Sequence, residues 1–209
     1  MEGYKDYKKL NNQFFSKLLT DNSDEAKVIG NSPASHQKRF KKLLELGNFD
    51  GKSVLDIGCG TGAFYRFLSA HSSRFDYTGY EVNEKMLEKA RKSHPEIADR
   101  FLLLDILEEP VDKSFDYCLS IGSLNLFMDE KTNYGMTFHM LDEMFAHCKI
   151  GFAFSMTSSL SRKKQADTFY YDPIIITNHV MRYCNNFRLD HSFLPHDFML
   201  FCYKDDFYK

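Results

Sequence analysis

Short apolar runs alternate with amphipathic stretches from residue 53 to near the end of the chain. The first five runs are rich in aliphatic and aromatic side chains, and they predict strands at 53–57, 75–81, 100–106, 115–121 and 150–156. Two further runs, 187–194 and 197–204, are separated only by Pro195-His196 and predict an antiparallel hairpin.

Between these runs, apolar residues recur at the spacing of one helix face, which predicts helices over 64–71, 83–94, 132–147 and 172–183. Asn83 caps the second of these helices, which ends before Pro95, and Asp172-Pro173 opens the last one. Strands that alternate with helices predict an α/β fold. We expect a seven-stranded, mostly parallel sheet with helices on both faces and one antiparallel strand from the terminal hairpin.

The first fifty residues follow a different pattern. Two helices are predicted, near 5–19 and 33–46, with a loop from Asn22 to Asn31 between them. Ser32 stands at the expected N-cap of the second helix, and Pro33 at its first position. We therefore divide the chain into an N-terminal helical segment, 1–50, which would cover a ligand site as a lid, and a main domain, 51–209.

Composition narrows the class of protein. Of the 209 residues, 43% are hydrophobic and 27% are charged, which is typical of a globular chain. The net charge of −2 does not favour a nucleic-acid partner. Five widely spaced cysteines without a Cys-x-x-Cys pair argue against a zinc ribbon or a disulfide framework and predict a reduced, cytoplasmic protein. We see no signal peptide, no run near the ~18 residues of a membrane span, and no cluster of metal ligands.

A glycine-rich turn follows the first predicted strand, in the sequence Asp56-Ile57-Gly58-Cys59-Gly60-Thr61-Gly62. Glycines allow the backbone to turn sharply and to approach a ligand closely, and the next helix points its free N–H groups at the same place. The spacing is GxGxG, whereas dinucleotide-binding sites have GxGxxG. Asp56 would disfavour a diphosphate and favour a ligand that carries an ammonium group.

The nine residues VLDIGCGTG, 54–62, resemble motif I of the class I S-adenosylmethionine-dependent methyltransferases. The resemblance implies a Rossmann-like, seven-stranded fold with a terminal hairpin. It also implies S-adenosylmethionine as the cofactor and S-adenosylhomocysteine as the product. Methyl transfer is an in-line displacement, for which the protein mainly aligns the reactants and excludes water.

The same resemblance implies which residues contact the cofactor. Glu81, at the end of the second strand, would accept hydrogen bonds from the ribose hydroxyls, and Asp105 with the N–H of Ile106 would meet the adenine. For both acids a solvated position is the alternative. The full set of expected cofactor contacts is Asp56, Gly58, Cys59, Gly60, Gly62, Glu81, Val82, Met86, Asp105, Ile106, Ser120, Ile121 and Arg39. For Cys59 we expect a steric role, not that of a nucleophile, and Met86 fits a core position equally well.

No residue is marked as obligatory for catalysis. The candidates on the expected rim of the site are His196, Asp197, Tyr170, Tyr171 and His36. His196 next to Asp197 would form an acid–base pair. The preference of Pro and Asp for turns explains this segment equally well. The run Arg162-Lys163-Lys164 would meet an anionic acceptor, with a solvated charge run as the alternative.

We therefore expect a methyltransferase that acts on oxygen or nitrogen of a small-molecule acceptor. The fourth strand ends in Ser-Ile-Gly-Ser-Leu-Asn, unlike the Asn/Asp-Pro-Pro-Tyr/Phe pattern of enzymes that methylate nucleobase or glutamine amino groups. RNA or protein acceptors stay an alternative because the segment 1–47 carries a net charge of +3. A non-catalytic S-adenosylmethionine-binding subunit or sensor is the alternative from another class, and an aminopropyl transferase is a third. The acceptor and the oligomeric state stay open.

Overall fold

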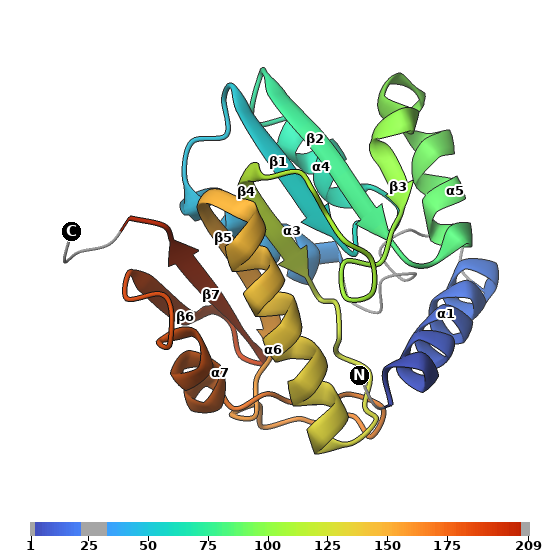
Figure 1. Cartoon of the computed structure of the whole chain (residues 1–209). Coiled ribbons are helices and arrows are strands. Elements are labelled where there is room, and N and C mark those ends of the chain that lie inside the picture. The colour runs from blue at the N-terminus through green and yellow to red at the C-terminus, as the bar shows by residue number, and fades with distance from the viewer. Residues whose placement is uncertain (1–2, 22–32, 206–209) are drawn as a thin grey trace.

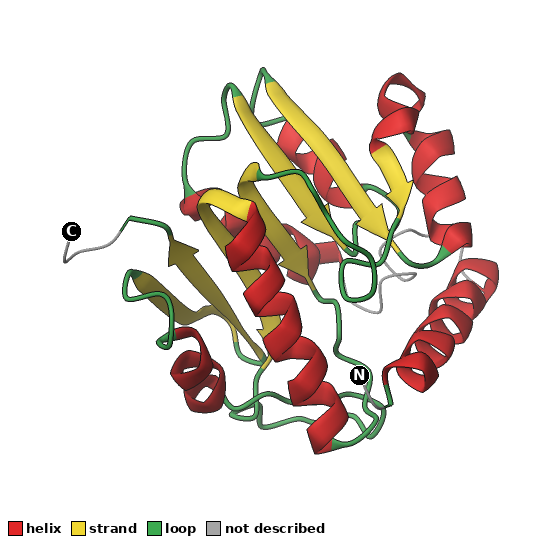
Figure 2. Ribbon diagram, viewed as in Figure 1, coloured by secondary structure: helices red, strands yellow, loops and turns green. Residues whose placement is uncertain are grey.

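One seven-stranded sheet forms the centre of the computed structural model, which describes residues 3–21 and 33–205 (Figures 1 and 2). The strands lie in the order β3-β2-β1-β4-β5-β7-β6. In chain order their bounds are β1 (Lys52–Ile57), β2 (Phe75–Glu81), β3 (Phe101–Leu103), β4 (Phe115–Ile121), β5 (Cys148–Thr157), β6 (Phe187–Leu194) and β7 (Asp197–Tyr203). The seven predicted strands are confirmed.

The pairing of the strands follows the predicted pattern. β1, β2, β3, β4 and β5 are parallel to one another, whereas β7 is antiparallel to both β5 and β6. β3 pairs only over Phe101–Leu103, shorter than the predicted 100–106, because the chain turns away at Asp105. The strand order reverses between β1 and β4, and ligands of such sheets bind beyond the carboxyl ends at this point.

Helices cover both faces of the sheet, as Figure 2 shows. Their bounds are α4 (Ala63–Ser69), α5 (Glu84–Ser93), α6 (Glu130–His147) and α7 (Pro173–Val180), with short 3₁₀ helices η1 (Leu44–Leu46) and η2 (Pro95–Arg100). The predicted cap of α5 is confirmed, because the Asn83 side chain accepts hydrogen bonds from the N–H groups of Lys85 and Met86. α7 ends at Val180, one turn earlier than expected.

Two further helices precede the sheet, α1 (Tyr4–Asp21) and α3 (Pro33–Leu43). α1 lies beside α5 beyond the carboxyl ends of the strands (Figure 1), and α3 packs against β6. The predicted loop 22–31 and the Ser32 cap lie outside the described residues. Among the helices in the described part of the chain, none has the length and apolar character needed to cross a membrane.

Side chains of the central strands alternate between two buried clusters, one on each face of the sheet. In β1, Leu55 and Ile57 face the cluster that α6 and α7 cover, whereas Val54 faces the cluster that α3, α4 and α5 cover. This alternation decides which residues at the strand ends reach a ligand.

Candidate functional site

The glycine turn after β1 is held in a left-handed conformation that glycine adopts readily. Gly58, Gly60 and Gly62 have φ values of 74°, 56° and 79°. The N–H groups of Gly58 and Cys59 donate to the carbonyl oxygen of Tyr80, at 2.8 and 3.0 Å, which fixes the turn against β2. A Cβ atom on Gly60 would lie 3.3 Å from the end of the Met86 side chain, so a side chain at this position would press on Met86.

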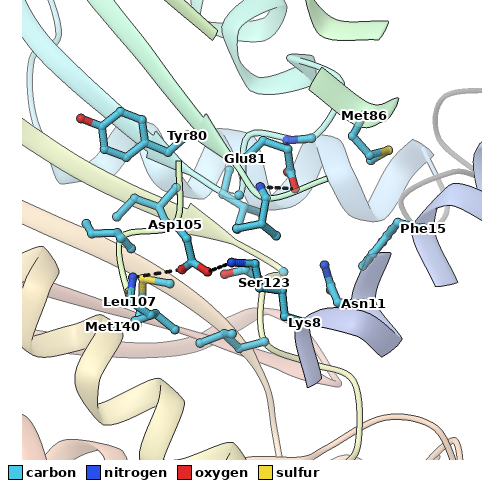
Figure 3. Close-up of a pocket in the computed structure, with 18 of the residues that line it drawn as sticks. Lys8, Asn11, Phe15, Tyr80, Glu81, Met86, Asp105, Leu107, Ser123 and Met140 are labelled. Carbon is cyan, nitrogen blue, oxygen red and sulfur yellow. Dashed lines mark hydrogen bonds and ion pairs between the residues drawn. The ribbon is translucent and has the colours of Figure 1, made fainter. Parts of the chain in front are cut away.

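Glu81, the last residue of β2, accepts hydrogen bonds from three backbone N–H groups, and Figure 3 shows its side chain at the cavity. Its Oε2 accepts from the Gly60 N–H at 2.9 Å, and its Oε1 accepts from the N–H groups of Val82 and Asn83, each at 2.9 Å. Burial raises the pKa of Glu81, whereas these three hydrogen bonds lower it, and the net shift of the pKa is upward. The carboxylate therefore lies in the wall of a cavity with its position fixed.

Asp105, just beyond β3, is covered by side chains of α1. Its Oδ2 accepts from Lys8 Nζ at 2.6 Å, its Oδ1 accepts from the Leu107 N–H at 3.1 Å, and the Tyr4 hydroxyl lies 2.8 Å from both oxygens. Lys8 also donates to Glu108 at 3.0 Å. Burial first, and then Asp105, raise the pKa of the Tyr4 hydroxyl, which keeps it a donor.

These groups surround a first cavity beyond the carboxyl ends of β1, β2 and β4, about 960 Å³ including space open to solvent (Figure 3). It brings together most of the cofactor contacts expected from the sequence: Gly58, Gly60, Glu81, Val82, Met86, Asp105, Ile106, Ile121 and Arg39. His36 lines the same cavity. Sequence reasoning missed the side chains that α1 contributes, which are Tyr4, Tyr7, Lys8, Asn11 and Phe15.

Asp56 lies apart from the lining of this cavity, which corrects its expected role. It shares the face of β1 with Val54, and its Oδ2 accepts from the Tyr77 hydroxyl at 2.6 Å on that side. Burial raises the pKa of Asp56 to about 7. The hydrogen bond on this face joins β1 to β2. The Asp56 carboxyl group therefore points away from the first cavity, where the ammonium group of the ligand was expected.

Three more expected contacts also lie outside the lining. The Cys59 side chain is buried against Gly79, and burial raises its pKa well above the ordinary value, so the thiol stays protonated and is no nucleophile. Gly62 caps α4, where a Cβ would meet His94 and Phe101. The Ser120 hydroxyl donates to the Ile57 carbonyl oxygen at 2.9 Å and so ties β4 to β1.

A second cavity of about 1880 Å³, including space open to solvent, adjoins the first. The two share wall residues from α1, α3 and the loop after β4, namely Tyr7, Asn11, Phe15, Arg39, Gly122 and Leu124. His196 and Tyr170 line the second cavity, as expected for the acceptor side. The run Arg162-Lys163-Lys164 also lines it and is exposed to solvent at the same time.

Two catalytic candidates have other positions than expected. Tyr171 is fully buried, and its hydroxyl donates to the Leu124 carbonyl oxygen at 2.6 Å, so it supports the cavity wall from behind. Asp197 accepts from Arg39 Nε at 2.6 Å, and both side chains are buried. The Arg39–Asp197 pair joins α3 to β7, and no hydrogen bond between the side chains of His196 and Asp197 is found among the described residues.

Among the described residues, no group of three His, Cys, Asp or Glu side chains is placed to hold a metal ion. The first cavity is built from the glycine turn, the two strand-end carboxylates and the inner face of α1.

The sequence model of a methyltransferase domain family matches residues 54–151, which include the glycine turn and both strand-end acids. This stretch of the chain is a methyltransferase domain. A Mycobacterium tuberculosis methyltransferase is 27% identical to it over 72% of this chain and 92% of that protein. A methyltransferase of Invertebrate iridescent virus 6 is 24% identical over 74% of this chain, which spans only 49% of the viral protein.

Solved structures of methyltransferases share the fold. Magnesium protoporphyrin IX methyltransferase from Synechocystis PCC 6803, crystallised with S-adenosylhomocysteine, has a TM-score of 0.69 and 14% identity, and the match covers 95% of this methyltransferase and 99% of that chain. The N-methyltransferase NodS from Bradyrhizobium japonicum WM9 has a TM-score of 0.63 and 16% identity, with 92% and 99% covered. At these identities the likeness establishes the fold.

Proposed function

We propose that this methyltransferase transfers the methyl group of S-adenosylmethionine to an oxygen or nitrogen atom of a small molecule that occupies the second cavity. The observation that carries the proposal is the wall that the two cavities share at Tyr7, Gly122 and Leu124. An acceptor in one cavity and the cofactor in the other would meet at this wall, which in-line transfer requires.

The first cavity offers a matching group for each part of the cofactor. Oε2 of Glu81 has one backbone partner, from Gly60, and would accept from a ribose hydroxyl. Asp105 and Ile106 lie at the adenine end, and Gly58 and Ile121 lie toward the shared wall, where we place the methionine half. The cofactor supplies a methyl group on a sulfonium, which is a reactive electrophile without further activation.

The residues of the chain then align and shield the reaction. α1 contributes Tyr7, Asn11 and Phe15 to both cavities and so covers the shared wall from the solvent side. When the acceptor oxygen or nitrogen bonds to the methyl carbon, the carbon–sulfur bond breaks and its electron pair stays on sulfur. A proton lost by the acceptor would pass to His196 in the second cavity or to water.

The lining of the second cavity favours an acceptor with an apolar body and an anionic group. Phe14, Leu126 and Leu160 supply apolar surface, while Lys163 and Lys164 bring positive charge to the rim.

Two relatives are consistent with such an acceptor. The malonyl-[acyl-carrier protein] O-methyltransferase of Acetivibrio thermocellus is 29% identical over 58% of this chain and 42% of that protein. The fatty-acid O-methyltransferase of Mycolicibacterium smegmatis is 32% identical over 37% of this chain and 29% of that protein. Both names describe transfer to oxygen on an acyl compound.

A screen with S-adenosylmethionine and matched pairs of fatty acids and fatty alcohols tests the proposal, with products detected by the mass of one added methyl group. We expect methylated product from the acids and not from the matched alcohols, and we expect the variant Lys163→Glu/Lys164→Glu to lose this activity. Lys149→Glu, at the opposite end of β5, is the control for a change of surface charge. Tight S-adenosylhomocysteine binding without product in any acceptor class would favour the non-catalytic sensor.

A further inference from the structure

The acid expected to meet adenine is already bonded to the protein's own N-terminal helix. Asp105 is 3% exposed, and the Lys8 ammonium and the Tyr4 hydroxyl lie within 2.8 Å of its oxygens. These partners are 97 and 101 residues away in the sequence, so they are not part of the turn that carries Asp105. Figure 3 shows Lys8 reaching from α1 to Asp105 across the cavity.

The hydrogen-bonding capacity of this carboxylate is almost filled. An ionised carboxylate accepts about four hydrogen bonds. The Leu107 N–H occupies one position on Oδ1, Lys8 occupies one on Oδ2, and the single hydroxyl proton of Tyr4 lies between the two oxygens. One position remains by this count, but Asp105 is only 3% exposed because Tyr4 and Lys8 lie against it. An adenine amino group would therefore reach the carboxylate only where Tyr4 or Lys8 moves away.

The same helix has a second anchor on the other side of the cavity. The side chain of Asn83, the N-cap residue of α5, donates to the Asn12 carbonyl oxygen at 3.1 Å and to the Ser16 hydroxyl at 3.2 Å. Asn83 follows Glu81 by two residues, so α1 spans the cavity from the adenine end to the ribose end. Release at Asp105 would leave this anchor in place and give the helix a fixed point to turn about.

We propose that Tyr4 and Lys8 form a latch on Asp105 that competes with the adenine of the cofactor, so that α1 opens when the cofactor enters. This inference rests on the proposed function, because it takes Asp105 as the adenine contact. α1 also lines the second cavity through Tyr7, Phe14 and Phe15. Opening of the latch therefore changes the acceptor cavity, which couples acceptor binding to prior binding of the cofactor.

Calorimetric titration with S-adenosylhomocysteine tests the latch on the full chain and on the variants Tyr4→Phe, Lys8→Met and the double variant. We expect each single variant to bind at least about tenfold more tightly than wild type, because a hydrogen bond to a charged group is worth about 10- to 150-fold in an equilibrium constant. Lys9→Met removes the same charge from the exposed face of α1 and is expected to leave the affinity unchanged.

The outcomes separate the latch from the proposed function. Weaker or unchanged binding by Tyr4→Phe and Lys8→Met would overturn the latch while leaving the cofactor site intact. Binding by the double variant alone would support the latch strongly. An absence of binding by wild type and every variant would contradict the proposed function as well as the latch.

Amide hydrogen exchange gives a second measurement, which does not depend on substitutions. In the wild-type chain we expect S-adenosylhomocysteine to slow exchange around Glu81 and to speed it in α1, because the helix loses its contacts with Asp105. Slower or unchanged exchange in α1 on addition of the ligand would contradict the latch.

Discussion

Replacement of Glu81 by Gln is expected to weaken cofactor binding while preserving the shape of the cavity. Two of the four acceptor positions of the carboxylate, on Oε1, are filled by Val82 and Asn83, and Gly60 fills a third on Oε2. One position remains for a ribose hydroxyl. A hydrogen bond to a charged group is worth about 1.5–3 kcal/mol, so the variant is expected to bind S-adenosylhomocysteine about 10- to 150-fold more weakly.

The assay is calorimetric titration of wild type and Glu81→Gln at pH 8, with thermal unfolding of both proteins as a control for folding. The amide has to direct its oxygen at one set of backbone donors, so some loss of stability is expected as well. Burial raises the pKa of Glu81, and the ionised form is the binding form, so wild-type affinity is expected to fall on acidification at a higher pH than an exposed glutamate would give. Equal affinity of the folded variant and wild type would refute the placement of the ribose.

Three further changes test other parts of the structure. Gly60→Arg fills the first cavity and is expected to abolish S-adenosylhomocysteine binding by calorimetry with little change in circular dichroism; unchanged affinity would remove the glycine turn from the site. Asp197→Asn leaves Arg39 buried beside a neutral side chain and is expected to lower the free energy of unfolding in urea by about 3–5 kcal/mol. Its control is Glu45→Gln, which removes the ion pairs of the exposed Glu45 with Arg188 and Lys42 and is expected to cost about 1 kcal/mol or less per pair. An equal loss of stability in both variants would contradict the larger cost that we assign to the buried pair. The third change is Asp56→Asn. We expect the difference in the free energy of unfolding, variant minus wild type, to be larger at pH 8 than at pH 5. Burial raises the pKa of Asp56 from 3.8 to about 7, so wild type loses stability as the pH rises between these values; urea unfolding that gave both proteins the same pH dependence would contradict this effect.

The sequence was sufficient to predict the strands and the residues at their carboxyl ends. Apolar runs mark the strands, and Glu81 and Asp105 lie at or just beyond the ends of two of them, so parallel pairing brings both acids to one edge of the sheet. Asp56 was misplaced because side chains alternate along β1, and a position two residues before the first glycine faces the opposite cluster.

The sequence led us to expect the segment 1–50 as a lid, but not the side chains with which α1 reaches the site. The pattern predicts a helix near 5–19, but nothing in it indicates which distant residues Tyr4 and Lys8 contact. Their spacing of four residues places both on one helix face, and this is the one local signal that could have suggested a shared target. Such long-range pairs depend on how the helix packs, and packing is fixed only when the whole fold is formed.

A crystal structure with S-adenosylhomocysteine tests the central claim most directly. We predict the ribose at Glu81, the adenine at Asp105 and the sulfur at the wall that the two cavities share near Gly122. We also predict that Tyr4 and Lys8 have left Asp105. Ligand bound elsewhere, or with its sulfur turned away from the second cavity, would contradict the proposed path of the methyl group.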